Sequence, residues 1–506
     1  MAPPRLSRYA WWPLRAVDVV SEALTAPLVH SLSHAAAFYI LTTHDDVSTP
    51  VLFFRYAVVG PILFILALLA LLPGLVGWVM WAALNTWASH LIQPFTYHAP
   101  GHPHSHPGGR VTISSANVLL CPEAVARFNN CPNTSWRLKE VSRRMLRQDK
   151  GLNQHPNLKP PVKRENVLVN QFPEVDIFML QEVLERWAGR AMVKALQDTY
   201  PYCVYDVGIH SRHTNLFMCG SGLFLASKFP VLDCTFHPYT YHSHYGTLVG
   251  LGVLLAKLDL GMVVRGGKEV RAVGYVANTH TQAYQGGKNI VSQQLTEAAS
   301  VYEKFVHETH DTHTETLMFA VLGGDFNVDN MSEGDRDSQH LPLWDEFIDP
   351  CRAGAGRDRT WSLGTEHRQK MLSHPALTHP STFRTVLLDD VLRRHFILDA
   401  DVKVHTLELM RVKPQPDSDG EVRARPEGGR RRIDRLLVRK GGPMQPASYW
   451  FTSAIAGLSD HLPVVMMLQE EEEEEKEMKE EVEEVVVEEE VKMESNEENV
   501  ESKKYV

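Results

Sequence analysis

The chain has 506 residues, 44% of them hydrophobic, which is enough for one large domain with additional segments. Its net charge of −10 is concentrated at one end, because residues 470–506 contain 18 Glu and 5 Lys. The rest of the chain is close to neutral, which excludes the strongly basic surface expected of a nucleic-acid-binding protein. Six cysteines without a C-x-x-C pair argue against a zinc cluster and favour a reducing compartment.

Residues 1–96 are expected to form a membrane-associated region with two hydrophobic segments, at about 10–41 and 56–84. The second segment has no charged residue and exceeds the roughly 20 apolar residues that cross a bilayer. It is also too long, and too far from the start, to be a signal peptide. Pro73 and Gly74 lie inside it, so a single tilted helix and a re-entrant hairpin both remain open.

The first hydrophobic segment is interrupted by Arg15, Asp18 and Glu22, which is typical of an interfacial or hairpin segment. Three arginines precede the first acidic residue and suit contact with anionic phospholipid head groups: Arg5, Arg8 and Arg15. The same arginines suit mitochondrial targeting equally well. We therefore expect association with a membrane that contains anionic phospholipids.

Two further segments are expected to lack regular structure. Residues 97–110, YHAPGHPHSHPGGR, are rich in Pro and Gly and read as a linker. Four histidines there offer an alternative as metal ligands, although a polar linker is the preferred interpretation: His98, His102, His104 and His106. Residues 469–506 are almost entirely Glu, Val, Lys and Met, which is typical of an acidic disordered tail.

Residues 111–468 alternate apolar strand patterns with helical patterns. Strand candidates such as VDIFMLQEV, RAVGYVANTH and TLMFAVLGGDF are nearly continuous apolar runs, which suits strands covered on both faces. Helical patterns lie between them at 184–200 and 289–308. The mixture predicts an α/β fold, a four-layer sandwich in which helices cover two packed sheets.

The stretch AVLGGDFNVDN, residues 320–330, ends an apolar run with Asp325 and Asn327. Gly, Asp and Asn are the usual turn residues, so a plain turn is one interpretation. Residues i and i+2 of a strand share a face, so the alternative is that both side chains hold one ligand. Polar residues also stand at the ends of other predicted strands: Asn117, Glu182 and His280 follow or close a strand, and Asp460 and His461 precede the apolar run LPVVMML. Together these strand ends favour a shared site.

This set of side chains suits metal-dependent hydrolysis of a phosphodiester. A hard divalent cation such as Mg²⁺, or Mn²⁺, binds oxygen ligands, and we expect Glu182 and Asn117 to supply them. His461 is expected to be the general base, because the ordinary pKa of histidine, about 6.5, lies near working pH. Asp460 would fix its tautomer, and Asp434 is a further candidate for that role.

Asp325 and Asn327 are expected to orient the nucleophile and the phosphate, and His280 to stabilise charge at phosphorus. The motifs QE, GDFN and SDHLP, in that order along the chain, resemble the endonuclease/exonuclease/phosphatase superfamily, which has the deoxyribonuclease I-like fold. Within it, the chain is similar to the membrane-anchored neutral sphingomyelinases over SSANVLLCP, SGLFLASKFPVLD, RRIDRLL and GLSDHLPV. The shorter, mitochondria-associated form of that family is the closer likeness.

The resemblance implies Mg²⁺-dependent hydrolysis of sphingomyelin to ceramide and phosphocholine at a membrane surface. It carries the family's functional residues to Asn117, Glu182, His280, Asp325, Asn327, Asp460 and His461. Mitochondrion or endoplasmic reticulum is the expected location, with the Golgi or the inner leaflet of the plasma membrane as the alternative. Other functions left open are a phosphoinositide phosphatase, a nuclease and a low-activity membrane scaffold, although the membrane segments favour a lipid substrate and no nucleic acid.

One part of the family pattern is absent. The family usually has Asp-x-x-x-Ser-Lys-Gly before the strand VLLAKL, whereas this chain has GTLVGLG, with Gly246 at the aspartate position and Leu251 at the lysine position. We therefore expect low basal activity with intact metal binding, and we expect restoration of both residues to raise turnover.

Overall fold

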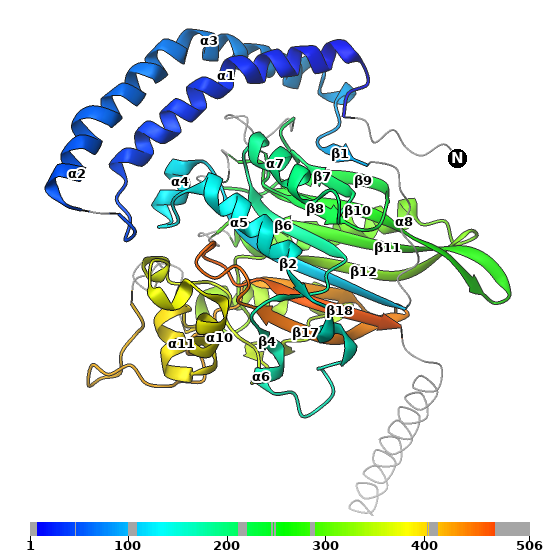
Figure 1. Cartoon of the computed structure of the whole chain (residues 1–506). Coiled ribbons are helices and arrows are strands. Elements are labelled where there is room, and N and C mark those ends of the chain that lie inside the picture. The colour runs from blue at the N-terminus through cyan, green and yellow to red at the C-terminus, as the bar shows by residue number, and fades with distance from the viewer. Residues whose placement is uncertain are drawn as a thin grey trace, which may run out of the picture.

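The described part of the chain is built around two β-sheets (Figure 1). The computed structural model describes residues 8–45, 47–99, 109–210, 220–243, 246, 249–283, 289–401, 403 and 413–470. Within these residues, the larger sheet has eight strands in the order β1 (Thr96–His98), β7 (Tyr202–Tyr205), β8 (Phe224–Ser227), β6 (Ile177–Val183), β2 (Arg110–Leu120), β18 (Val464–Glu470), β17 (Met444–Thr452) and β4 (Leu168–Val169). The smaller sheet, over the same described residues, has six in the order β13 (Phe347–Ile348), β16 (Asp434–Arg439), β12 (Glu315–Asp325), β11 (Lys268–His280), β10 (Gly252–Arg265) and β9 (Val231–Pro238).

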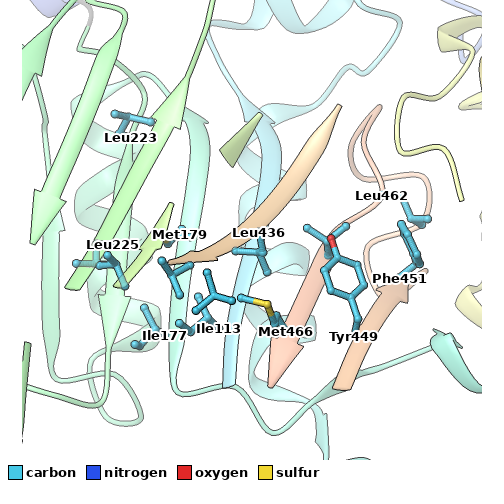
Figure 2. Close-up of a cluster of buried hydrophobic side chains, with 14 of the residues drawn as sticks. Ile113, Ile177, Met179, Leu223, Leu225, Leu436, Tyr449, Phe451, Leu462 and Met466 are labelled. Atoms are coloured by element: carbon cyan, nitrogen blue, oxygen red, sulfur yellow. The ribbon is translucent and has the colours of Figure 1, made fainter. Parts of the chain in front are cut away.

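The sheets pack face to face around a shared apolar core. Figure 2 shows this core, where Ile113 of β2, Met179 of β6 and Met466 of β18 meet Leu436 of β16. A second buried cluster lies between the larger sheet and the helices α5 (Thr134–Leu146) and α7 (Arg186–Leu196). A third lies between the smaller sheet and α8 (Ile290–Thr309). The four-layer α/β sandwich expected from the sequence is therefore confirmed.

The sequence patterns explain these elements. Strand β2 is buried at every residue after Arg110, because the core covers one face and helices cover the other. The helices expected at 184–200 and 289–308 correspond to α7 and α8; in α7 the buried residues Ala188, Met192 and Leu196 recur at helical spacing. The remaining short elements are α4 (Glu123–Phe128), β3 (Gln148–Asp149), α6 (Arg164–Val167), β5 (Phe172–Pro173), α9 (Leu343–Glu346), β14 (Arg352–Gly354), β15 (Arg357–Asp358), α10 (Pro380–Leu388) and α11 (Asp390–Phe396).

The N-terminal region forms a helical hairpin that arches over one side of the sandwich (Figure 1). Helix α1 (Trp12–Tyr39) packs antiparallel against α3 (Gly60–Trp87), which a π-helical turn joins to α2 (Thr49–Phe54). The resulting run Thr49–Trp87 is, in the described part of the chain, the one helix long and apolar enough to cross a membrane. It continues through Pro73, so the re-entrant hairpin inside 56–84 is not formed.

Small residues allow α1 and α3 to approach closely. A Cβ on Gly77 would lie 2.5 Å from Thr25 Oγ1, and one on Gly74 would lie 2.5 Å from the Leu28 side chain. Ser21 Oγ donates a hydrogen bond to the Gly77 carbonyl at 2.8 Å. Glycine in α3 thus serves helix packing, as in other close helix pairs in membranes.

The charges that interrupt the first hydrophobic segment lie against the sandwich. Asp18 is fully buried and pairs with Arg186 of α7 at 2.8 Å, and Glu22 lies 3.1 Å from the same arginine. Arg8 is also buried, 3.5 Å from Asp206, so the expectation that it meets lipid head groups is wrong. Arg15 remains exposed. These ion pairs form because a buried charge needs a partner, and the helix meets the sandwich here.

The boundaries at both ends of the sandwich also differ from expectation. Tyr97 and His98 belong to β1, which pairs with β7, so the linker expected over 97–110 begins later. His102, His104 and His106, and Arg5, lie outside the described residues. Strand β18 extends to Glu470, and the rest of the expected acidic tail lies outside the described residues as well.

Candidate active site

The polar strand ends meet at one edge of the sandwich. In the smaller sheet, His280 of β11 is in register with Asp325 of the parallel strand β12, and Asp325 is in register with Asp434 of the antiparallel strand β16. In the larger sheet, Asn117 of β2 is in register with Gln181 of β6, which directly precedes Glu182. The face-to-face packing of the two sheets therefore brings side chains from both together.

Asp325 lies at the centre of this edge. Its Oδ2 accepts a hydrogen bond from Asn117 Nδ2 at 3.1 Å and lies 3.5 Å from His280 Nε2 and 3.7 Å from His461 Nε2. Its Oδ1 accepts the backbone N–H of Asn327 at 3.0 Å. Asn327 has a φ of 50°, and its Nδ2 donates to the Thr281 carbonyl at 3.0 Å. The stretch is thus both a turn and a shared polar site.

Asn117 presents its amide nitrogen to the carboxylates. Nδ2 donates to Glu182 Oε1 at 2.9 Å as well as to Asp325, while Oδ1 accepts the backbone N–H of Leu119 at 3.1 Å. A backbone N–H requires an acceptor, so this contact fixes the amide orientation. In this orientation the nitrogen faces the carboxylates, and the oxygen, which has a second lone pair, accepts one backbone N–H. The assignment of Asn117 as a metal ligand stays a prediction. It holds two carboxylates in place.

His461 is oriented by Asp434, which the sequence had offered only as a further candidate. The fully buried Asp434 places Oδ2 2.9 Å from His461 Nδ1. Asp460, the expected partner, lies on the other side of the ring, with Oδ1 3.9 Å from Nε2. Burial alone would lower the pKa of His461, but the carboxylates of Asp434, Asp325 and Asp460 raise it well above 6.5.

Glu182 and Asp460 are the carboxylates with capacity for a cation. Burial raises the pKa of Glu182, with His280 opposing, and its φ of 62° is a strained backbone value for a non-glycine residue. Asp460 Oδ2 accepts from Gln369 Nε2 at 3.1 Å, whereas Oδ1 is buried without a hydrogen-bond partner among the described residues. An orphaned carboxylate oxygen beside a second carboxylate fits a hard divalent cation.

Another group of possible metal ligands consists of Asp325, Asp434 and His461, whose ligand atoms lie within 4.8 Å of one another. The 2.9 Å contact between His461 Nδ1 and Asp434 Oδ2 is a hydrogen-bonding distance, so these two atoms already pair, while Asp434 Oδ1 is buried without a hydrogen-bond partner among the described residues. We therefore interpret this group as a histidine–carboxylate pair with Asp325 on its open side.

Several residues that sequence reasoning did not single out hold the site. Gln181 Nε2 donates to Asn278 Oδ1 at 2.7 Å, which links β6 to β11 across the two sheets. Ser459 Oγ donates to the Asn117 carbonyl at 2.7 Å and accepts the His461 N–H at 3.2 Å. A polar residue inside an apolar strand, as Asn278 is, was the available signal, because buried amides need partners.

The two family positions that depart from the pattern lie in the segment that leads into β10, where Gly252 is in register with His280 of β11. Leu251 is buried in the apolar cluster of the smaller sheet, beside Tyr239 and Val253. A Cβ on Gly246 would lie 2.6 Å from Gln282 Oε1, an atom that also accepts the Ser243 N–H at 2.9 Å. Leucine at 251 therefore contributes to packing.

The chain is similar to known proteins in sequence and in structure. The Endonuclease/Exonuclease/phosphatase family model matches residues 115–461. "Sphingomyelin phosphodiesterase 5" of Danio rerio is 34% identical over 300 residues, 58% of this chain and 52% of that protein, so the chain spans about half of its length. "Sphingomyelin phosphodiesterase 5" of Mus musculus is 28% identical over 402 residues, 76% of this chain and 78% of that protein. A crystal structure of sphingomyelinase C from Streptomyces griseocarneus matches with a TM-score of 0.38 and 16% identity, over 71% of this chain and 99% of that one.

Proposed function

Since the chain belongs to the endonuclease/exonuclease/phosphatase family, we propose that it hydrolyses a phosphodiester bond, and that the substrate is sphingomyelin, with ceramide and phosphocholine as products. The observation that carries the chemistry is the His461–Asp434 pair facing the Glu182, Asp325 and Asp460 carboxylates. The names of the relatives, sphingomyelin phosphodiesterases, support the substrate. The activity is assigned to the domain at 111–468.

His461 is the general base. With Asp434 bound at Nδ1, the neutral ring carries its proton there and leaves the Nε2 lone pair toward the site. Nε2 takes a proton from the attacking water, whose oxygen forms a bond to phosphorus. The bond from phosphorus to the ceramide oxygen breaks, and that oxygen leaves with the electron pair and takes up a proton. His461 then releases its own proton to solvent.

The neighbouring side chains orient the reactants. Asp325, 3.7 Å from His461 Nε2, accepts a hydrogen bond from the attacking water. His280, whose Nε2 lies 3.5 Å from the same Asp325 oxygen, and Asn327 contact the phosphate and stabilise charge as it develops. Asn117 keeps Glu182 and Asp325 close together despite their like charge.

Mg²⁺, with Mn²⁺ as a substitute, is the cofactor that we propose, held by Glu182 and by the free oxygen of Asp460. Its contribution when bound is to polarise a phosphoryl oxygen and to offset charge on the leaving group. Clustered carboxylates that include an orphaned buried oxygen support this assignment.

The location of the N-terminal hairpin supports a lipid substrate. Helix α1 contacts α4, and its Asp18 pairs with Arg186 of α7; these two helices directly follow the strand ends carrying Asn117 and Glu182. A groove between α1 and the sandwich is lined by Val29, Pro122 and Leu184. Leu184 lies two positions after Glu182 in the chain. We propose attachment to a membrane containing anionic phospholipids, in the mitochondrion or endoplasmic reticulum. The near-neutral body supports the absence of a nucleic-acid partner.

The test compares three substrates with the purified full chain. Sphingomyelin, a phosphoinositide and single-stranded DNA are each supplied with Mg²⁺, and His461→Ala serves as the inactive control. Release of phosphocholine from sphingomyelin alone supports the proposal. Cleavage of only the phosphoinositide or the DNA would assign the site to another member of the family, and equal rates for wild type and His461→Ala would refute the mechanism.

A further inference from the structure

A hydrogen-bonded contact connects the catalytic edge to the N-terminal hairpin. It begins at Gln369, in a 3₁₀ turn that precedes α10 in the chain. Gln369 Nε2 donates to Asp460 Oδ2 at 3.1 Å and to Asn129 Oδ1 at 2.9 Å. Because this amide occupies one carboxylate oxygen of Asp460, the other oxygen is directed toward His461 Nε2, at 3.9 Å. Gln369 thus determines which oxygen of Asp460 faces the site.

Asn130 forms the next link. This residue is buried, with a φ of 59°, and its side chain contacts both neighbouring segments. Nδ2 donates to the Gln369 carbonyl at 2.7 Å and to Thr43 Oγ1 at 2.7 Å, while Oδ1 accepts the Thr43 backbone N–H at 2.7 Å. Every polar atom of the amide is therefore used to join Thr43 to Gln369.

Thr43 lies in the connection between α1 and α2 of the hairpin. Its hydroxyl also accepts a hydrogen bond from Ser373 Oγ at 2.7 Å, four residues after Gln369. Arg127 fastens the same connection, donating from Nε to the Ile40 carbonyl at 2.9 Å. The contacts that hold the hairpin on the sandwich are therefore connected to the contact that orients Asp460. We name this set of contacts the Thr43–Asn130–Gln369 clamp.

We propose that Gln369 is a positioning residue for Asp460, and that the Thr43–Asn130–Gln369 clamp makes the orientation of this carboxylate depend on how the hairpin is seated. The proposal rests on the proposed function, since Asp460 is assigned there to cation binding. A hairpin seated on the sandwich holds Gln369 against Asp460. A displaced hairpin releases Asn130 and Gln369, and Asp460 loses its fixed orientation.

The first arm of the experiment removes the donor. We compare Gln369→Ala and Gln369→Met with wild type, as full-length chains on sphingomyelin vesicles. Methionine keeps the side-chain volume of glutamine, so Gln369→Met serves as the test if the alanine variant does not fold. At a fixed Mg²⁺ concentration below saturation, loss of a hydrogen bond to a charged group should lower kcat about tenfold to a hundredfold, since the defect acts through cation binding at Asp460. KM for sphingomyelin should stay within about twofold, because Gln369 does not face the lipid.

The second arm breaks the link to the hairpin. Asn130→Gly deletes the amide and keeps a residue that adopts the positive φ without strain. It should lower kcat in the same direction, and the double variant with Gln369→Ala should be no worse than Gln369→Ala alone, because the two residues act in series. Gln148→Ala is the matched control, since Gln148 Nε2 donates to the Met145 carbonyl at 2.9 Å away from the site.

Binding of Mn²⁺, measured by electron paramagnetic resonance on the same proteins, separates this proposal from the proposed function. Gln369→Ala and Asn130→Gly should weaken Mn²⁺ binding several-fold, and Gln148→Ala should not, even if wild type fails to cleave sphingomyelin. Wild-type Mn²⁺ affinity and kcat in both Gln369 variants would overturn the positioning role. A loss in Gln369→Ala with an unchanged Asn130→Gly would overturn the dependence on the hairpin.

Discussion

His461 Nδ1 lies 2.9 Å from Oδ2 of the fully buried Asp434, so the general base that we propose takes its orientation from a residue 27 positions earlier in the chain. Strand β16 places Asp434 beside Asp325 of β12, and the connection before β18 places His461 beside both. This pair determines which ring nitrogen accepts the proton, and it raises the pKa of His461 against the effect of burial.

Asp434→Asn should therefore lower kcat about a hundredfold or more, because the ring is no longer held in the productive tautomer. The pH profile should change as well. Only neutral His461 accepts a proton, so the rate rises as pH increases through its raised pKa. Loss of the Asp434 charge lowers that pKa, and the rising part of the profile should shift to lower pH. Steady-state rates between pH 5 and pH 9 measure both effects.

Asp460→Asn is the comparison variant for that profile. Asp460 does not contact Nδ1, so its main effect should be on the Mg²⁺ concentration needed for half-maximal rate. If Asp460→Asn reproduces the tautomer defect while Asp434→Asn is close to wild type, the assignment of the orienting carboxylate is wrong.

Glu182→Gln should abolish activity without unfolding the protein. When a chelator has removed the metal, the wild-type protein holds the carboxylates of Glu182 and Asp325 close together through Asn117. The glutamine variant removes one of these two negative charges, so its melting temperature should equal or exceed that of wild type under the same condition. Mg²⁺ should raise the melting temperature of wild type and restore its activity, and should do neither for Glu182→Gln. Differential scanning calorimetry with and without Mg²⁺ measures this, and a Mg²⁺-stabilised Glu182→Gln would place the cation elsewhere.

Much of this site could be predicted from the sequence, because a polar side chain at the end of an apolar strand adds little to the core and is free to bind a ligand. Glu182, His280, Asp325 and His461 are such residues, and the structure brings them to one edge. The general α/β arrangement followed from the same strand patterns. The role of each residue in the mechanism stays a prediction.

The contacts of three side chains could not be predicted from the sequence, because they depend on the direction that the folded backbone gives each side chain. The sequence does not show that the Leu119 N–H donates to the Asn117 oxygen and that the Asn117 nitrogen faces the carboxylates. Asp460 adjoins His461 in sequence, yet its carboxylate lies 3.9 Å from Nε2 and not at Nδ1, because the chain bends at Asp460. Asp18 interrupts an apolar helix for a reason visible only in the fold, its contact with Arg186.

Leu251→Lys should destabilise the protein by about 3 kcal/mol or more, because it places a charge in an apolar cluster. The structure therefore changes the expectation that Gly246→Asp with Leu251→Lys raises turnover: the double variant should lose stability and gain no activity. Thermal unfolding tests this against Leu146→Lys, a change at a position 41% exposed on α5. A wild-type melting temperature with higher turnover would restore the expectation drawn from the sequence.

Removal of the N-terminal hairpin should release the sandwich from membranes, and the position of the truncation should matter. Phe95 is buried in the shared core and β1 pairs with β7, so a chain beginning at Ile92 should keep its melting temperature. A chain beginning after residue 106 loses the edge strand and should melt lower. Flotation with vesicles after a high-salt wash, followed by thermal unfolding, tests both points. Persistent vesicle binding by either truncation would locate the membrane contact within the sandwich.

The most direct test of the central claim is the fate of the water oxygen. The purified full chain is incubated with sphingomyelin vesicles and Mg²⁺ in H₂¹⁸O, and both products are analysed by mass spectrometry. If His461 activates water for attack at phosphorus, phosphocholine carries one ¹⁸O, ceramide carries none, and His461→Ala forms neither product above background. Label in ceramide, or equal product from wild type and His461→Ala, would contradict the account.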